Sequence, residues 1–187
     1  MPATAQTARQ DRPAGERILS TAHDLFYRDG IRATGIDRII KEAGVTKVTF
    51  YRYFPSKNDL IRAYLLHRHE RWMAWFSDAL QRHGADIGAL VPALGEWLRD
   101  PGYRGCAFIN SVSELGRTVP EVADIARRHK RDMVTAIAAL LPPSRHRTRD
   151  AQALGLVVDG AIVQAQFADT PDDALAALRT SVSLLTR

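Results

Sequence analysis

The sequence predicts an all-α protein in which a small basic domain precedes a larger helical domain. Apolar residues recur at spacings of three and four along most of the chain, which is the period of an α-helix. Glycine, proline and small hydroxyl residues interrupt these runs where helices should end and begin. Residues 1–71 carry 13 Lys and Arg against 8 Asp and Glu, whereas residues 72–187 carry 13 of each. A basic front suggests contact with a polyanion, although an uneven use of arginine explains the charge equally well by itself.

Composition excludes several classes of protein. No apolar run approaches the roughly 20 residues of a membrane-spanning helix, and the polar N-terminus lacks a signal sequence, so we expect a cytoplasmic protein with no membrane partner. Cys106 is the only cysteine, which leaves no internal disulfide and no cysteine-based zinc site. The motifs GxGxxG, GxSxG and HExxH are absent. We therefore expect no metal, no cofactor and no enzymatic activity.

Two helices are predicted first. Residues 13–29 repeat apolar side chains at helical spacing, and Gly30 follows where a left-handed C-terminal cap is expected. Thr34 is the predicted N-cap of the second helix, because Asp37 follows three residues later, and Gly44 ends the apolar repeat. The second helix is therefore short and clearly delimited.

A third helix is predicted from Thr46, another N-cap candidate, to about Phe54, because a proline follows. Phe50 and Phe54 lie one turn apart and should anchor this helix in the core. The other sides carry hydroxyls and cations that can bind phosphates or guanine edges, while Val48 and the Thr49 methyl group can contact thymine. Two short helices joined by a tight turn, the second with such a surface, are typical of a helix-turn-helix DNA-binding motif.

Residues 34–61 read TGIDRIIKEAGVTKVTFYRYFPSKNDLI. With the helix before it, this block resembles the DNA-binding domain of the TetR family of bacterial transcriptional regulators. The resemblance implies a homodimer, usually a repressor, that releases a palindromic double-stranded DNA operator when a small-molecule effector binds the larger domain. Carried over by position, it implies operator contacts by Thr34, Gly35, Thr46, Lys47, Val48, Thr49, Tyr51, Arg52, Tyr53 and Lys57. The alternative is a helical module that binds a protein or a ligand and does not use DNA.

A long fourth helix is predicted from its N-cap Ser56 to about residue 83, before Gly84. Such a helix spans roughly 40 Å, so one element can contact both domains, and the domain boundary should fall inside it without a flexible linker. The predicted organisation is a disordered N-terminal arm at residues 1–12, a helix-turn-helix domain at 13–58, and an effector-binding and dimerisation domain at 59–187.

Five further helices are predicted in the second domain. The fifth covers residues 87–98, where Pro92 predicts a kink or a later start, and the sixth covers about 106–117. The seventh runs from Pro120 to about residue 141. The eighth, at about 149–168, is apolar nearly all round, which predicts packing on several sides. The ninth begins with Thr170 as N-cap and Pro171 as first helical residue.

The ninth helix carries one apolar stripe, formed by Leu175, Leu178, Val182 and Leu185. This spacing fits a seam against a partner helix. We therefore expect a homodimer through the eighth and ninth helices, as the resemblance also implies. The alternative is that both helices complete a monomeric core.

A small, largely apolar effector is expected to bind among the helices of the second domain. The candidate residues combine large rings with a few polar groups: Trp72, Trp75, Phe76, Trp97, Cys106, Phe108, Asn110, Ser113, Asp159, Ile162 and Gln166. Aromatic residues at helical spacing are often plain core, so that alternative stays open. Asp159 lies in an apolar stretch and needs a partner, either a ligand or a structural pair.

Overall fold

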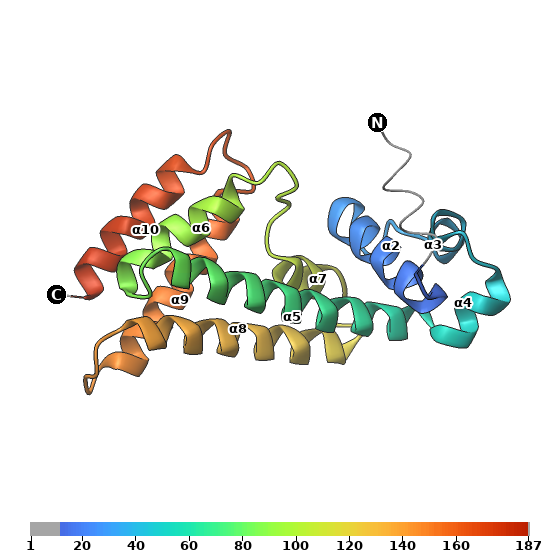
Figure 1. Ribbon diagram of the computed structural model, residues 1–187, viewed down its shortest axis with the longest axis horizontal. Helices are drawn as coiled ribbons and strands as arrows, with labels where there is room; N and C mark the ends of the chain where they lie inside the picture. The colour runs from blue at the N-terminus through green and yellow to red at the C-terminus, as the bar shows by residue number, and fades with distance from the viewer. Residues whose placement is uncertain (1–11, 187) are drawn as a thin grey trace.

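The computed structural model describes residues 12–186, which form an elongated, all-helical molecule with a small domain at one end (Figure 1). Within these residues there are nine α-helices and one 3-10 helix. In chain order they are α2 (Ala14–Asp29), α3 (Ile36–Ala43), α4 (Lys47–Tyr53), α5 (Lys57–Arg82), η1 (Ile87–Ala89), α6 (Leu90–Leu98), α7 (Ala107–Leu115), α8 (Pro120–Leu140), α9 (Arg147–Gln164) and α10 (Asp172–Leu185). Apart from Arg12, the predicted N-terminal arm lies outside the described residues.

The small domain consists of α2, α3 and α4, packed against the start of α5. Each helix contributes apolar side chains to one shared core, among them Ile18 and Phe26 from α2, Ile39 from α3, Phe50 from α4 and Leu60 from α5. Burial of a side chain of this size contributes roughly 1.5–3 kcal/mol. The three short helices are therefore held by their common core, since helices this short are marginal alone.

Two boundaries in the small domain differ from the sequence prediction. The N-cap of α3 is Gly35 in an extended conformation, so the predicted cap at Thr34 is wrong. Thr34 is fully buried, and its hydroxyl donates to the Gly30 carbonyl at 2.7 Å, which closes the α2–α3 loop. Gly30 has φ 89° and ψ 155°, outside the predicted left-handed helical region, although its positive φ still favours glycine.

The long helix α5 joins the small domain to the body and lies along much of the molecule (Figure 1). Ser56 Oγ accepts from the Asp59 N–H at 3.1 Å, which confirms the predicted cap. The first turn of α5 buries Leu60 and Ile61 in the small domain, and later turns bury Trp72 in the body. Because no loop interrupts α5, its rotation or tilt would be transmitted between the two domains.

The body contains α6 to α10 and the rest of α5. Pro92 lies in the first turn of α6, which follows the 3-10 helix η1, so the predicted later start is confirmed. Helices α5 and α8 lie side by side, and α9 packs on both α8 and α10. The N-cap of α10 is Pro171 and no side chain caps this helix, so the predicted cap at Thr170 is wrong.

The apolar stripe of α10 is largely buried within its own chain. Leu175, Leu178 and Val182 are 5%, 0% and 8% exposed, and α10 packs on α9 and α6. The prediction that this stripe is free for a partner helix is therefore wrong. Helix α9 packs on several sides as predicted, since it contacts both α8 and α10, although Leu156 on it is 75% exposed. The exposed side chains of α9 and α10, among them Leu156 and Leu184, lie on the other faces of these helices.

No helix within residues 12–186 is long and apolar enough to cross a membrane. Across the same part of the chain, no group of three or more His, Cys, Asp or Glu residues is placed to hold a metal ion.

Candidate nucleic-acid interface

Helix α4 lies at the far end of the small domain and is fixed by one cap and one buried ring. Thr46 Oγ1 accepts from the Thr49 N–H at 3.1 Å, as predicted, and lies 2.9 Å from the Thr49 hydroxyl. Phe50 has no exposed surface, whereas the second predicted anchor, Phe54, is only half buried and follows the helix as its C-cap. One buried phenylalanine therefore fixes the rotation of α4 about its axis.

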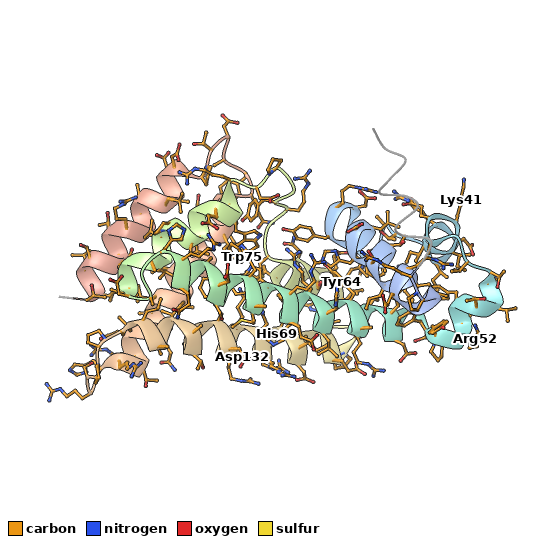
Figure 2. All side chains as sticks on the ribbon, in the orientation of Figure 1. Lys41, Arg52, Tyr64, His69, Trp75 and Asp132 are labelled. Carbon is orange, nitrogen blue, oxygen red and sulfur yellow. The ribbon has the colours of Figure 1, made fainter. Side chains whose placement is uncertain are left out.

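The rest of α4 faces solvent. Val48 is 81% exposed, Tyr51 39% and Tyr53 45%, and Lys47 and Arg52 are exposed beside them. Figure 2 shows Arg52 at this end of the molecule, away from the body. Two cations, two phenols and one valine thus share an exposed surface on a helix narrow enough for the major groove of DNA.

The turn before α4 is held by a residue that the sequence analysis missed. Arg17 on α2 donates through Nε to the Ala43 carbonyl and through Nη2 to the Gly44 carbonyl, each at 3.2 Å. Gly44 adopts the left-handed conformation that ends α3, with φ 62°. Arg17 therefore satisfies carbonyl groups at the end of α3 and orients the turn. Its position in the sequence shows only that it lies on a helix, so no local pattern marks this role.

Gly15 also helps to position the interface. A Cβ atom at Gly15 would lie 2.8 Å from the Tyr53 ring, so a side chain there would displace this tyrosine. The Arg52 guanidinium lies 5.5 Å from the centroid of the same ring. The position of the Tyr53 ring is thus set by its contact with α2 at Gly15 and by the neighbouring Arg52 guanidinium.

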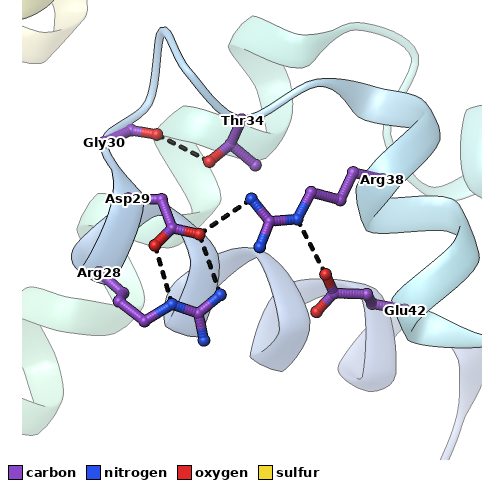
Figure 3. Close-up of polar contacts among 6 residues, drawn as sticks. All are labelled: Arg28, Asp29, Gly30, Thr34, Arg38 and Glu42. Atoms are coloured by element: carbon purple, nitrogen blue, oxygen red, sulfur yellow. Dashed lines mark hydrogen bonds and ion pairs between the residues drawn. The ribbon is translucent and has the colours of Figure 1, made fainter.

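Charged side chains fasten α3 to the end of α2 (Figure 3). The Asp29 carboxylate accepts from Arg28 Nε at 2.8 Å and pairs with Arg38 Nη1 at 2.9 Å, while Arg38 Nε donates to Glu42 at 2.9 Å. The hydrogen bond from Arg28 is the main reason why the pKa of Asp29 is lowered. These groups are exposed, so their contribution is mainly geometric.

The predicted contact residues therefore separate into two groups. The exposed set on and before α4 comprises Thr46, Lys47, Val48, Tyr51, Arg52 and Tyr53, with Thr49 half buried among them and Gly35 exposed at the start of α3. Thr34 and Lys57 do not fit a side-chain contact with DNA. Thr34 is buried, and Lys57 donates through Nζ to the Ile31 carbonyl at 2.7 Å, with its pKa lowered by burial. Sequence position alone could not show that the Lys57 side chain turns inward.

Hydrogen bonds connect the small domain to α7 and the loop before it. The Glu114 carboxylate on α7 accepts from the Ile31 N–H at 3.3 Å and the Arg32 N–H at 2.8 Å. The Tyr27 hydroxyl donates to the Gly105 carbonyl at 2.9 Å and accepts from the Arg104 N–H at 3.0 Å. A displacement of α7 would therefore strain the attachments of the small domain.

The predicted effector residues do not line one pocket. Trp72, Trp75 and Trp97 line a cleft of about 420 Å³ beside α5 and α6, and their ring centroids lie 5.5–6.2 Å apart. Figure 2 shows Trp75 on the upper side of α5. The Trp72 Nε1 atom is buried without a hydrogen-bond partner among the described residues. Phe108 and Asp159 instead line a groove between α7, α8 and α9.

This α7–α9 groove has a volume of about 920 Å³, which is sufficient for a drug-sized ligand. Its walls are mostly apolar and include Phe108, Ile109, Val112, Met133, Val134 and Leu156. Arg127, Lys130 and Arg131 add positive charge, and Lys130 Nζ forms a half-buried ion pair with Asp159 at 2.5 Å. Of the two partners predicted for Asp159, the structure therefore shows a structural pair, the one with Lys130. Both residues of this pair line the groove.

The other predicted effector residues lie outside both sites. Phe76, Cys106 and Ile162 are buried core residues, so the core alternative describes them. Gln166 Nε2 lies 3.3 Å from Asn110 Oδ1, and Ser113 is exposed on α7. The prediction that these residues line one pocket with the tryptophans is wrong, because helical spacing cannot show which interhelical space a side chain enters.

A buried histidine pair lies between α5 and α8. His69 Nδ1 and His129 Nδ1 are 3.2 Å apart, and His69 Nε2 lies 3.4 Å from an Asp132 carboxylate oxygen (Figure 2). The His129 ring stacks on Phe108 with centroids 3.8 Å apart. Burial lowers the pKa of His129 to about 2, so its imidazole stays neutral near pH 7.

Comparisons with known proteins agree with this arrangement. A family model described as "Bacterial regulatory proteins, tetR family" matches residues 18–64. SCO4454, a TetR-family transcriptional regulator from Streptomyces coelicolor, is 30% identical, with a TM-score of 0.82 over 93% of this chain and 96% of that chain. The HTH-type transcriptional regulator UidR of Escherichia coli (strain K12) is 28% identical over 76% of this chain and 68% of the relative. The transcriptional regulator AcuR of Cereibacter sphaeroides is 29% identical over 82% of this chain and 73% of the relative.

Proposed function

The chain belongs to the TetR family of bacterial transcriptional regulators, and from this premise we propose that it is a homodimeric repressor released from a palindromic operator by an effector. DNA binding itself follows from family membership. One observation carries the assignment of the contact residues: α4 buries Phe50 and exposes Lys47, Val48, Tyr51 and Tyr53. In a dimer, two such helices about 34–36 Å apart would enter successive major grooves.

The contact surface is tested by replacing Lys47, Thr49, Tyr51 and Tyr53 together with alanine. We expect loss of sequence-specific binding in a gel-shift titration against an operator selected from genomic fragments, because phosphate and base contacts are removed together. Arg128→Ala on α8 is the charge-matched control and should retain binding. Equal weakening by both variants would point to nonspecific electrostatics, and retained binding by the fourfold variant would contradict the assignment.

We place the dimer interface on the exposed faces of α9 and α10. Leu156 and Val163 on α9 lie seven residues apart and therefore on one face, with Phe167 just beyond the helix, and Leu184 lies on α10. An exposed apolar surface of this kind favours association with a second chain. Leu156→Asp with Phe167→Asp should yield a monomer in analytical ultracentrifugation and weaken operator binding, since one small domain contacts only half of the operator. A dimer that survives both substitutions would exclude this interface.

The effector is proposed to be a small, largely apolar molecule in the α7–α9 groove. Helix α7 is the connection, because Ile109 and Val112 line the groove whereas Glu114 binds backbone N–H groups of the small domain. A ligand that displaces α7 would therefore change the position of α4 through these hydrogen bonds. Only a ligand that binds the two conformations with different affinity can release the operator.

The groove and the tryptophan cleft can be distinguished by two variants. Ile109→Trp should fill part of the groove, whereas Trp75→Ala should enlarge the cleft. A panel of apolar compounds is screened for a rise in melting temperature and for operator release. We expect active compounds to lose both effects on Ile109→Trp and to keep them on Trp75→Ala. The reverse pattern would move the effector site to the cleft.

A further inference from the structure

We infer that Val48 contacts the methyl group of a thymine, so that each operator half-site contains an A·T pair at one fixed position. This inference rests on the proposed function and specifies which sequences the interface accepts. It concerns an apolar contact on a surface that is otherwise polar and positively charged.

The fold does not explain a valine at this position. Val48 is 81% exposed, the highest value among the large hydrophobic side chains exposed in residues 12–186, and it is not packed against the hydrophobic core. Valine also has a lower helix propensity than alanine, by roughly 0.5 kcal/mol. An exposed valine in the first turn of a seven-residue helix therefore slightly disfavours the helix that carries it. A contact outside the chain would offset that cost.

The chemistry of the major groove limits what this contact can be. Base edges there present hydrogen-bond donors and acceptors, and the only methyl group is the C5 methyl of thymine. A valine side chain cannot satisfy a donor or acceptor, so placing it against a guanine or cytosine edge would desolvate that edge without replacement. Its β-branched side chain has few rotamers and loses little freedom on contact.

The neighbouring threonine is a weaker candidate for the same contact. The Thr49 hydroxyl lies 2.9 Å from the Thr46 hydroxyl, the Thr49 N–H donates to Thr46, and the residue is half buried. Thr49 is therefore oriented by the cap of α4. Val48 has no polar atoms in its side chain and faces solvent between the exposed Lys47 and Arg52.

The test uses an operator selected by the full-length protein from a random duplex library. Each thymine of this operator is replaced in turn by deoxyuridine, which lacks only the C5 methyl group. For the wild type, removal of a single methyl group, at one position in one half-site, should weaken binding about fourfold. This is the value expected for one buried methyl group. Substitution at the equivalent positions of both half-sites should weaken binding roughly 15-fold, if the two contacts are additive.

Val48→Ala should bind the thymine and deoxyuridine operators with nearly equal affinity, because the methyl contact is already lost. Thr49→Ser keeps the hydroxyl that contacts the capping Thr46 hydroxyl, removes one methyl group, and should retain the sensitivity to deoxyuridine. Circular dichroism should show unchanged helix content for both variants.

Two results would overturn the inference while leaving the proposed function intact. The first is a wild type that tolerates deoxyuridine at every position, and the second is a Val48→Ala variant that keeps the full sensitivity while Thr49→Ser loses it. Failure to enrich any sequence from the library would instead overturn the proposed function, and this inference with it.

Discussion

The two ends of the molecule expose apolar side chains in different surroundings. In the small domain, the exposed large hydrophobic residues are Val48, Tyr51 and Tyr53, all on α4 and beside Lys47 and Arg52. In the body they are Val112, Leu156, Val163, Phe167 and Leu184, on or next to α7, α9 and α10. The first set is mixed with positive charge, as a nucleic-acid interface requires, whereas the second suits an apolar ligand or a second chain.

This difference shows what a helical pattern does and does not determine. Periodicity identifies the residues that leave water, but it does not say whether the same chain or another molecule covers them. Leu178 on α10 is fully buried by its own chain, whereas Leu184 on the same helix is 60% exposed. Both are leucines on one amphipathic helix, so only the three-dimensional arrangement separates them.

The largest expected effect compares one phenylalanine from each end. Phe50→Ala removes a fully buried ring and should lower the free energy of unfolding by about 3–5 kcal/mol. Phe167 is 70% exposed, so Phe167→Ala should change the stability of the isolated chain by no more than about 0.5 kcal/mol while weakening the dimer. Urea unfolding at several protein concentrations measures the first effect, and sedimentation measures the second.

Concentration dependence decides this comparison. The decrease in the free energy of unfolding caused by Phe50→Ala should be the same at every protein concentration, because the ring packs within one chain. The decrease in stability caused by Phe167→Ala should appear only at protein concentrations where the wild type is dimeric. If Phe167→Ala destabilises a dilute monomer as much as Phe50→Ala does, Phe167 belongs to the core of one chain and the proposed interface fails.

The small domain was predicted more accurately than the body for a physical reason. Its helices are short and follow local signals, so Thr46, Ser56 and the phenylalanine at position 50 were placed from neighbouring residues alone. Thr34 was misplaced because its hydroxyl bonds backward to Gly30 instead of forward to the helix. Arg17 and Glu114 were missed because their partners lie 26 or more residues away.

In the body, helix limits were predicted well and contacts were not. Pro92 and Pro120 mark helix starts that the structure confirms. The residues grouped into one effector pocket, however, separate into a cleft, a groove and the core. Long helices can pack in several rotations and offsets, and a single sequence does not distinguish them.

The next comparison sets a buried titratable group of the body, His129, against the exposed ion pairs of the small domain. Burial lowers the pKa of His129 to about 2, against about 6.5 in an unfolded chain. Below pH 6.5 the unfolded chain therefore binds a proton that the folded chain does not. The free energy of unfolding should fall by about 2 kcal/mol between pH 7 and pH 5 from this group alone.

The contribution of His129 is isolated by comparing the wild type with His129→Gln, which cannot titrate in this range. Urea unfolding at pH 7 and pH 5 should show a smaller loss for the variant, whatever its stability at pH 7. Equal losses for the two proteins would show that His129 is not neutral and buried in the folded state.

The smallest expected effect compares two threonines predicted as N-caps from the same pattern. Thr46→Ala should cost about 1 kcal/mol, because Thr46 Oγ1 accepts from the Thr49 N–H and the variant leaves that donor without its partner. Thr170 does not cap α10, whose N-cap is Pro171, so Thr170→Ala should change the free energy of unfolding by no more than about 0.5 kcal/mol. Urea unfolding of the two variants in parallel measures both values.

Because α4 is only seven residues long, the lost cap should also loosen the interface and lower operator affinity for Thr46→Ala alone. Equal costs for the two substitutions would mean that the Thr46 hydroxyl stabilises its helix no more than the Thr170 hydroxyl, which is not a cap. The orientation of the exposed α4 surface would then depend on Phe50 alone.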